Sequence, residues 1–351
     1  MAERLHIGVI GCGKIAQVRH IPEYVANPNA KLIGFFDRSA ERADEVATRY
    51  NALAYGSWQE LVADPGIDAV SICVANASHA EIAIGALQAG KHVLLEKPMA
   101  TTLEDCEAVV AAADAAGKLL MLGHNQRFTK AHKLARDLVT SGAIGRLVTF
   151  RTTFGHGGPE TWSIDPGSNT WFFNPQLTTM GAIGDLGVHK TDLLHFLTGE
   201  RVVAVSALLA SNDKLDAQGT PIAVDDNAVA LYTLSNGAIG TMMASWSFHG
   251  AEDNSTVLYG QDGIIEIYTD PDYQVKLIRP GQPVEQFSVE AIQTNDNQTT
   301  SGVIDAFVAA VLTGVSSPVS GTEALAAMRA IFACMESSRT GRVVTIDKNK
   351  I

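Results

Sequence analysis

The chain has 351 residues, of which 46% are hydrophobic and 18% charged, and its formal net charge is −12. This length is sufficient for two domains, and the composition argues against a disordered chain. The negative charge disfavours nonspecific binding to nucleic acid or to anionic membranes. The sequence shows neither an N-terminal signal segment nor an apolar run of membrane-spanning length, so we expect a cytoplasmic protein.

The first third of the chain alternates short apolar runs with segments of helical periodicity. The apolar, β-rich runs are His6–Ile10, Leu32–Phe36, Ala69–Val74, His92–Leu95 and Leu119–Leu122. The helical segments are Ser39–Tyr50, His79–Ala89 and Leu103–Ala116. Strands without polar alternation, separated by amphipathic helices, are typical of a parallel sheet with helices on both faces. Pro22 predicts that the first helix ends or kinks early.

After about Arg127 the pattern becomes typical of a largely antiparallel sheet with helices on one side. Helices are expected at Lys130–Ser141, Asp185–Leu197, Ile304–Leu312 and Thr322–Ser338. Strands are expected at Leu147–Phe154, Val202–Leu209, Ala228–Leu234, Ala238–Ser247, Thr256–Tyr259, Gly263–Tyr268 and Gln274–Ile278. Asn236-Gly237 and Asp262-Gly263 indicate hairpin turns. Between strand and helix lies a long loop that contains glycine and tryptophan, Gly155–Gln176.

The first strand leads into a glycine turn, Gly11-Cys12-Gly13-Lys14-Ile15-Ala16. The first glycine permits a tight turn, the second lets the backbone approach a pyrophosphate, and the helix N-terminus favours the phosphate charge. Asp37, at the end of the second strand, suits the adenosine ribose of NAD, whereas Arg38 beside it suits the 2′-phosphate of NADP. We therefore predict a dinucleotide site that includes Gly11, Gly13, Lys14, Ile15, Asp37 and Arg38, with NAD preferred and NADP as the alternative.

Two further polar segments follow apolar strands of this part of the chain. Asn76 and His79 lie where ligands gather in open α/β sheets, although His79 would equally serve to satisfy backbone groups at a helix terminus. Glu96-Lys97-Pro98 ends another strand. The ammonium of Lys97 can stabilise a developing alkoxide or take part in proton transfer, and the alternative is a structural ion pair with Glu96. All four polar residues are candidates for the cofactor site.

Asp185 and His189 are spaced i and i+4, so a helix directs both side chains to one face. A neutral imidazole can accept a hydroxyl proton as hydride leaves the same carbon, and the carboxylate can orient the substrate or the imidazole. One alternative is a metal site, although no third ligand lies at a spacing typical of metal motifs. The other is an aspartate that caps the helix, beside a histidine whose hydrogen bonds are purely structural. Weaker candidates in loops are Asn125 and Arg127 for the cofactor and His156, Trp162 and Trp171 for the substrate.

These motifs together resemble the glucose–fructose oxidoreductase, inositol dehydrogenase and rhizopine-catabolism (Gfo/Idh/MocA) family of NAD(P)-dependent oxidoreductases. The resemblance rests on residues 10–16, 90–98 and 184–192, and residues 336–342 are similar too. It implies an N-terminal Rossmann domain over residues 1–124. It also implies a C-terminal α/β domain over residues 125–351, whose large and mostly antiparallel open sheet often mediates dimers or tetramers.

The resemblance implies that Lys97, Asp185 and His189 match the family's catalytic residues and that His156 contacts the substrate. Many members have Trp-Arg in the loop before the Asp/His helix, and this chain departs from them because Phe172 follows Trp171. We expect NAD-dependent oxidation of a secondary ring hydroxyl of a cyclitol, sugar or glycoside to a ketone, in a homodimer or homotetramer. The alternatives are an NADP-dependent reductase of a keto or aldehyde sugar and a non-catalytic dinucleotide-sensing regulator.

Overall fold

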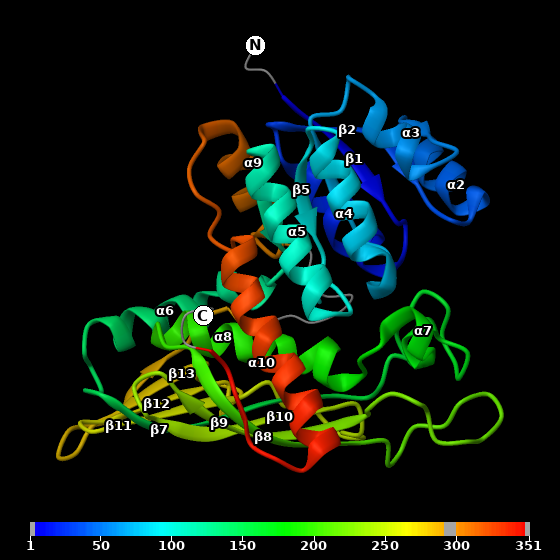
Figure 1. Ribbon diagram of the computed structural model, residues 1–351. Helices are drawn as coiled ribbons and strands as arrows, with labels where there is room; N and C mark the ends of the chain where they lie inside the picture. The colour runs from blue at the N-terminus through cyan, green and yellow to red at the C-terminus, as the bar shows by residue number, and fades with distance from the viewer. Residues whose placement is uncertain (1–3, 291–299, 348–351) are drawn as a thin grey trace. The chain divides into compact units, whose positions relative to one another are not determined.

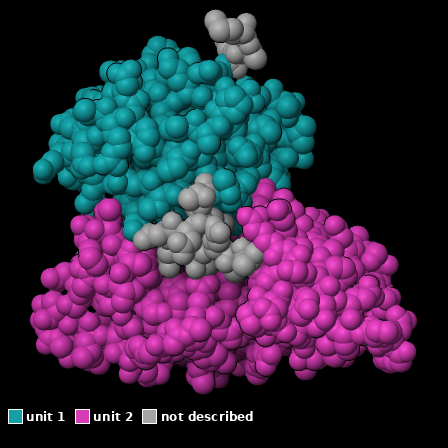
Figure 2. Space-filling model, turned by 180° about the vertical axis from the view of Figure 1, so that it is seen from behind, with its two compact units in different colours: residues 1–125, 293–325 teal, residues 126–292, 326–351 magenta. Residues whose placement is uncertain are grey.

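The computed structural model describes residues 4–290 and 300–347. The chain forms two compact units, shown in different colours in Figure 2. The first unit comprises Met1–Asn125 and Gln293–Leu325, and the second comprises Gln126–Ile292 and Ala326–Ile351. Each unit holds one of the two sheets and buries its own set of apolar side chains.

The first unit contains a parallel sheet with the strand order β3-β2-β1-β4-β5-β6. The strands are β1 (Leu5–Ile10), β2 (Ala30–Phe36), β3 (Leu53–Ala54), β4 (Ala69–Ile72), β5 (His92–Leu95) and β6 (Leu120–Leu122). Strand β1 pairs with β2 on one side and β4 on the other, so the direction of winding reverses there. The predicted doubly wound parallel sheet is confirmed, and this reversal point is where such sheets bind ligands.

Short helices connect these strands, and several begin at the side chains that favour helix starts. They are η1 (Ala16–His20), α1 (Ile21–Ala26), α2 (Ala40–Tyr50), α3 (Trp58–Ala63), η2 (Asn76–Ser78), α4 (His79–Gln88) and α5 (Leu103–Ala116). A further helix of the first unit, α9 (Val303–Thr313), belongs to its second stretch of chain. Ser39 and Thr102 accept hydrogen bonds from the backbone three residues on and so cap α2 and α5. Gly117 ends α5 in the left-handed conformation. Helices α4 and α5 pack side by side on the sheet (Figure 1).

Of the two outcomes expected at Pro22, an early end or a kink of the first helix, the early end is wrong. A π-helical turn over Ala16–His20 runs directly into α1, where Pro22 occupies one of the first two positions. The N–H of Ile21 donates to the carbonyl oxygen of Ala16, five residues back, and Pro22, which has no N–H to donate, follows directly after this wider turn. The helix α3 and the two-residue edge strand β3 were not predicted.

The second unit contains a sheet of nine strands in the order β14-β13-β12-β11-β7-β10-β9-β8-β15. The strands are β7 (Leu147–Gly155), β8 (Val202–Ala210), β9 (Asn227–Leu234), β10 (Ile239–Ser245), β11 (Thr256–Gly260), β12 (Ile264–Ile267), β13 (Val275–Ile278), β14 (Glu285–Phe287) and β15 (Val344–Thr345). All neighbouring pairs are antiparallel except β7 with β10. The predicted mostly antiparallel sheet and both predicted hairpins are confirmed, whereas the edge strands β14 and β15 were not predicted.

Helices cover one face of this sheet (Figure 1). The helical segments of the second unit are α6 (Lys130–Thr140), η4 (Trp171–Phe173), α7 (Pro175–Thr178), η5 (Ile183–Gly187) and α8 (Val188–Thr198). Two segments, η3 (Asn125–Phe128) and α10 (Gly321–Thr340), include residues of both units. On the helical side, Tyr232 of β9 hydrogen-bonds Thr191 of α8.

The other face of the nine-stranded sheet exposes several large apolar side chains. Leu208 of β8, Leu231 of β9 and Ile239 of β10 are 74%, 58% and 60% exposed. They alternate with buried residues because successive side chains of a strand point to opposite faces. Within residues 4–290 and 300–347, no helix combines the length and the apolar character needed to cross a membrane.

Candidate active site

The glycine turn has the geometry that dinucleotide binding requires. Gly11 has a φ of +93°, and a side chain there would lie 2.5 Å from the carbonyl oxygen of Cys73. Gly13 differs, since an added Cβ would meet no protein atom within 4 Å. The protein itself therefore leaves open space at Gly13, as a bound pyrophosphate needs. Ala16 is fully buried, which lets the following helix lie close to the sheet.

Asp37 links the second strand to this turn. Its Oδ2 accepts a hydrogen bond of 2.8 Å from the backbone N–H of Cys12, and its Oδ1 accepts one of 2.8 Å from Ser39. Each carboxylate oxygen has a second lone pair for a ribose hydroxyl. Lys14 and Ile15 follow Gly13 and are partly exposed, and Arg38 is exposed beside Asp37. The predicted cofactor residues of this segment thus lie together at the carboxyl ends of β1 and β2.

His79 is buried and contacts backbone on two sides. Its Nδ1 lies 2.6 Å from the carbonyl oxygen of Pro98, and its Nε2 lies 3.1 Å from that of Val74. Burial lowers the pKa of His79, although the two carbonyl groups favour the charged ring. These contacts favour the structural alternative, in which His79 joins the end of β4 to the Glu96-Lys97-Pro98 segment. Asn76, also buried, begins the turn η2 that leads to His79.

Glu96 is buried behind Lys97, which is partly exposed. The Oε1 of Glu96 accepts a hydrogen bond of 2.9 Å from Nε2 of His20, and its Oε2 accepts one of 3.1 Å from the backbone N–H of Lys97. Burial works against ionisation, but the hydrogen bond and charge of His20, with the charges of Lys97 and Arg19, lower the pKa of Glu96 to about 2. The carboxylate therefore stays ionised and holds the backbone that presents Lys97.

Asn125 and Arg127 belong to the turn η3. Asn125 is buried in the first unit. Arg127 forms a two-pronged ion pair inside the second unit, with Nε donating to Oδ2 of Asp192 at 2.7 Å and Nη2 donating to Oδ1 at 2.6 Å. Both side chains are almost completely buried. This pair gives Arg127 a structural function besides the predicted contact with the cofactor.

Asp185 and His189 occupy successive turns of one helix, as predicted. Asp185 lies in the π-helical turn η5, and His189 lies in the first turn of α8. Single π-helical turns inside α-helices are frequent at functional sites. The Oδ2 of Asp185 accepts a hydrogen bond of 3.0 Å from the indole N–H of Trp246, a buried residue that the sequence analysis missed. Asp185 and His189 keep 7% and 8% of their surface exposed, so neither is sealed from solvent.

An aromatic cluster connects this pair to the predicted substrate loop. It consists of Phe154, His156, Trp162, Trp171, Phe172, Phe173 and Trp246. Phe154 lies between His189 and His156, with ring centroids 6.1 Å and 5.5 Å away. Phe172 stacks on Trp171 at 3.9 Å and meets the rings of Trp162 and Trp246 at 5.1 Å and 6.2 Å. The cluster therefore runs from His189 to the tryptophan that holds Asp185.

The structure thus brings together the predicted substrate residues of the second unit. Asp185, His189, His156, Trp162 and Trp171 are all joined by direct contact or through the aromatic cluster. Lys97 belongs to the first unit, whereas Asp185 and His189 belong to the second. Phe172 contacts three other rings of the cluster, those of Trp162, Trp171 and Trp246. Within the described ranges, no group of three or more His, Cys, Asp and Glu residues could hold a metal ion.

Two family models match the chain. Residues 5–124 match GFO_IDH_MocA, described as an oxidoreductase family with an NAD-binding Rossmann fold. Residues 132–266 match the GFO/IDH/MocA C-terminal domain. Together the two matched segments contain every candidate residue described above except Asn125 and Arg127, which lie between them.

Named relatives and a solved structure are similar over most of the chain. The levoglucosan dehydrogenase of Pseudarthrobacter phenanthrenivorans is 33% identical in an alignment of 293 positions that covers 75% of this chain and 73% of that protein. The myo-inositol 2-dehydrogenase of Thermotoga maritima is 28% identical in an alignment of 272 positions that covers 75% of this chain and 72% of that protein. The structure of levoglucosan dehydrogenase in complex with NADH and levoglucosan matches with a TM-score of 0.86 and 26% identity, covering 99% of this chain and 100% of that chain.

Proposed function

Because the chain belongs to the GFO/IDH/MocA oxidoreductase family, whose N-terminal domain is an NAD-binding Rossmann fold, we propose that it oxidises a secondary ring hydroxyl of a cyclitol, sugar or glycoside to a ketone. One observation carries this proposal. Asp185 and His189 lie one helical turn apart and share a single aromatic cluster with the predicted substrate loop. A carboxylate and an imidazole beside aromatic faces are what the oxidation of an alcohol on a ring requires.

The residues of the first unit fit NAD. The open space at Gly13 and the carboxylate of Asp37 tied to the same turn support a site for the pyrophosphate and ribose. When bound, NAD supplies the acceptor for the hydride. The full set proposed to line the cofactor site is Gly11, Gly13, Lys14, Ile15, Asp37, Arg38, Asn76, His79, Glu96, Lys97, Asn125 and Arg127. Of these, His79 and Glu96 also keep the internal contacts described above.

In the proposed reaction the C–H bond of the substrate gives up a hydride, and the hydroxyl group gives up its proton to the imidazole of His189. The C–O bond becomes a carbonyl. Lys97 donates a hydrogen bond to the same oxygen and stabilises its developing negative charge. Asp185, held by the indole of Trp246, keeps substrate and base aligned, and His156, Trp162 and Trp171 contact the ring. Glu96 fixes the backbone of Lys97.

Replacement of Lys97 by alanine tests this assignment. We expect kcat to fall by about 10²- to 10⁴-fold, because the variant loses a group that acts on the reacting oxygen. The assay follows NADH absorbance with a panel of inositols, hexoses and glycosides, using NAD and NADP. Lys31→Ala is the control, since Lys31 lies exposed in β2 and its loss should leave kcat unchanged. A Lys97→Ala protein with an intact kcat would refute the mechanism.

The second candidate is an NADP-dependent reductase of a keto or aldehyde sugar. Arg38 favours it, because this exposed guanidinium stands beside Asp37, where a 2′-phosphate would bind. Binding of NAD and NADP to the native protein and to Asp37→Ala separates the two candidates. If Asp37 selects NAD, its removal shifts the preference towards NADP. The complete set of Lys97, Asp185 and His189 argues against a non-catalytic regulator.

We further propose that residues 1–124 bind the dinucleotide and that residues 125–351 provide the substrate and oligomer contacts. The exposed face of the nine-stranded sheet supports a homodimer or homotetramer. Leu208, Leu231 and Ile239 are exposed there on three neighbouring strands. Large apolar side chains that gather in this way on one face of a folded protein favour an interaction site there.

A further inference from the structure

Two consecutive carboxylates, Asp225 and Asp226, immediately precede strand β9. The first of them holds the start of the helix that carries Asp185 and His189. Its Oδ1 accepts a hydrogen bond of 2.9 Å from the backbone N–H of Gly181, and its Oδ2 accepts one of 2.7 Å from that of Ile183. The backbone N–H of Ala182 donates to the carbonyl oxygen of Asp225 at 2.8 Å. The carboxylate thus binds N–H groups that the helix start leaves without helical partners.

The backbone at Gly181 lies very close to the backbone at Asp225. A side chain at Gly181 would overlap the carbonyl oxygen of Asp225, so only glycine fits there. Burial raises the pKa of Asp225 to about 6, although the hydrogen bonds from Ile183 and Gly181 lower it. The two backbone N–H donors favour the ionised carboxylate, whose negative charge faces the positive end of the helix.

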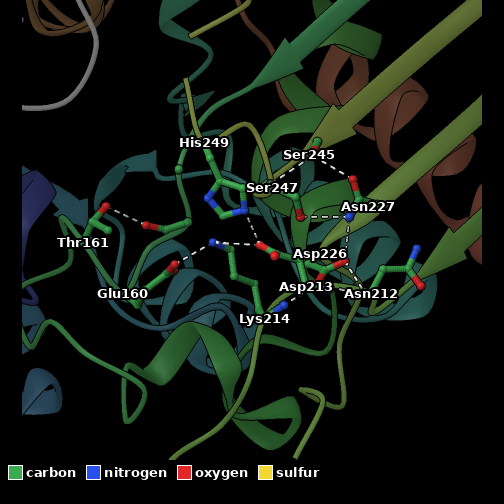
Figure 3. Close-up of polar contacts among 12 residues, drawn as sticks. Glu160, Thr161, Asn212, Asp213, Lys214, Asp226, Asn227, Ser245, Ser247 and His249 are labelled. Carbon is green, nitrogen blue, oxygen red and sulfur yellow. Dashed lines mark hydrogen bonds and ion pairs between the residues drawn. The ribbon is translucent and has the colours of Figure 1, made fainter. Parts of the chain in front are cut away.

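Asp226 holds a different segment, residues 212–214 (Figure 3). Its carboxylate accepts hydrogen bonds from the backbone N–H groups of Asn212, Asp213 and Lys214, at 2.9 Å for Asn212 and 2.7 Å for each of the other two. Asp226 is fully buried. Burial opposes ionisation, but these backbone hydrogen bonds lower the pKa of Asp226 below its ordinary value. The carboxylate thereby fixes the backbone from which Lys214 projects.

Lys214 in turn holds the substrate loop. Figure 3 shows its ammonium between two carboxylates, with Nζ 2.7 Å from Oε1 of Glu160 and 3.3 Å from Oδ2 of Asp213. Glu160 lies four residues after His156 and two before Trp162. Burial alone would lower the pKa of Lys214, but Glu160 and Asp213 raise it above the usual value of a lysine. The ammonium is charged and ties the loop with the aromatic residues to the segment that Asp226 holds.

We infer that Asp225 and Asp226 are positioning residues that hold the two sides of the substrate site in register. Asp225 fixes the helix with the base and its partner carboxylate, and Asp226 acts through Lys214 and Glu160 on the loop with His156 and Trp162. The backbone N–H of Trp246, whose indole holds Asp185, also donates to the carbonyl oxygen of Asp226 at 2.8 Å. The Lys214–Glu160 pair is half-buried, with 8% and 24% of the two side chains exposed, so it is screened less than a surface pair and can hold the loop in place. This inference rests on the proposed function.

The test compares kcat with KM in variants of the two groups of contacts, called branches below. One branch is Asp225 with the helix start, and the other is Asp226 with Lys214, Glu160 and the substrate loop. We expect Asp225→Asn to lower kcat by about tenfold or more with KM changed by less than about twofold, because a displaced base slows the chemical step. We expect Lys214→Met to raise KM by about tenfold with kcat changed by less than about twofold, because the displaced loop weakens substrate binding. Asp216→Asn is the control. Asp216 also accepts backbone hydrogen bonds, from Gln218 and Thr220 in the same loop, and its loss should change neither constant.

Two further variants separate positioning from general destabilisation. Lys214→Arg keeps a cation for Glu160 and should restore the native KM. The double variant Lys214→Met/Glu160→Gln should be no worse than Lys214→Met, because both single changes break the same ion pair. The inference would be overturned if Asp225→Asn and Lys214→Met each lowered kcat and raised KM by similar factors. It would also be overturned if the rise in KM of the double variant equalled the product of the rises in the two single variants.

Hydrogen exchange gives a readout that does not depend on turnover. Asp225→Asn should speed amide exchange in residues 181–189 and leave residues 156–170 unchanged, and Lys214→Met should do the reverse. Exchange that rises equally in both segments would contradict separate branches. A wild-type protein that oxidises no ring alcohol would refute the proposed function instead, and the exchange pattern would still decide whether the two carboxylates hold different segments.

Discussion

At the scale of single residues, Glu96 shows how a buried carboxylate can hold the backbone of a neighbouring residue in place. It was predicted as a cofactor contact, yet in the structure both carboxylate oxygens have partners within the protein. His20 donates to one oxygen, and the backbone N–H of Lys97 donates to the other. The second ring nitrogen of His20 lies 2.9 Å from the hydroxyl of Ser71, which itself lies 3.1 Å from the hydroxyl of Tyr24. Because a carboxylate only accepts, Nε2 of His20 must carry the proton.

The depressed pKa of Glu96 predicts a pH-dependent contribution to stability. Its folded-state pKa of about 2 lies below the ordinary 4.5, so the carboxylate stabilises the fold above pH 4.5, and this contribution is lost as the pH falls from 4.5 towards 2. Glu96→Gln should lower the free energy of unfolding by about 2 kcal/mol near neutral pH, with the deficit shrinking on acidification. Urea titrations of both proteins at several pH values measure this.

Glu45→Gln is the matched control for that experiment. Glu45 forms an exposed pair with Arg49 one turn away on α2, with both side chains at least half accessible. Such surface pairs contribute about 0.5 kcal/mol or less. A Glu96→Gln deficit that stays constant or grows as the pH falls would show that Glu96 is not held ionised by its surroundings.

At the scale of elements, the start of the helix that carries Asp185 and His189 depends on one glycine. Gly181→Ala should lower the free energy of unfolding by roughly 3 kcal/mol or more, as severe overpacking does. The reason is that the added Cβ would overlap the carbonyl oxygen of Asp225. Gly250→Ala is the control, since a Cβ at Gly250 meets no atom within 4 Å. Thermal unfolding of the two variants provides the comparison. A Gly181→Ala protein as stable as the wild type would mean that this close approach does not exist in solution.

Most elements of the two sheets could be predicted because burial imposes a period on the sequence. Strand β9 alternates buried and exposed residues, and α5 lies between a capping Thr102 and a left-handed Gly117. The π-helical turns η1 and η5 could not be predicted, since no residue preference marks the single extra residue in the turn. The short edge strands β14 and β15 bury few side chains and leave no period to detect.

The candidate site was predictable only where a motif placed its residues close in sequence. Gly11 to Ala16, Glu96 with Lys97, and Asp185 with His189 are local patterns. The groups that hold them come from far away in the chain, since Trp246 is 61 residues from Asp185 and His20 is 76 residues from Glu96. Such contacts arise from tertiary packing, for which one sequence carries no periodic signal. The pair Asp225-Asp226, two adjacent carboxylates just before an alternating strand, was the one feature of the sequence that could have indicated such a distant supporting group.

At the scale of the whole molecule, the exposed face of the nine-stranded sheet predicts self-association. Leu231→Lys should weaken a dimer by about tenfold or more, because it places a charge among Leu208, Val229 and Ile239. Light scattering over a range of protein concentrations measures the mass. Val25→Lys, which changes an exposed valine of the first unit, should leave the mass unchanged. A native protein that is monomeric at every concentration would disprove the oligomer proposal.

The first unit is assembled from two stretches of chain that are distant in sequence. Glu23 accepts hydrogen bonds from the backbone and hydroxyl of Ser301, Asn27 donates to Asp305, and the N–H of Leu122 donates to the carbonyl oxygen of Val319. A fragment cut after residue 124 would lose these partners and expose the surface under α9. Anyone who grafts this nucleotide-binding half onto another protein should therefore transfer residues 300–325 as well, and hybrid enzymes spliced at a single junction should fold poorly.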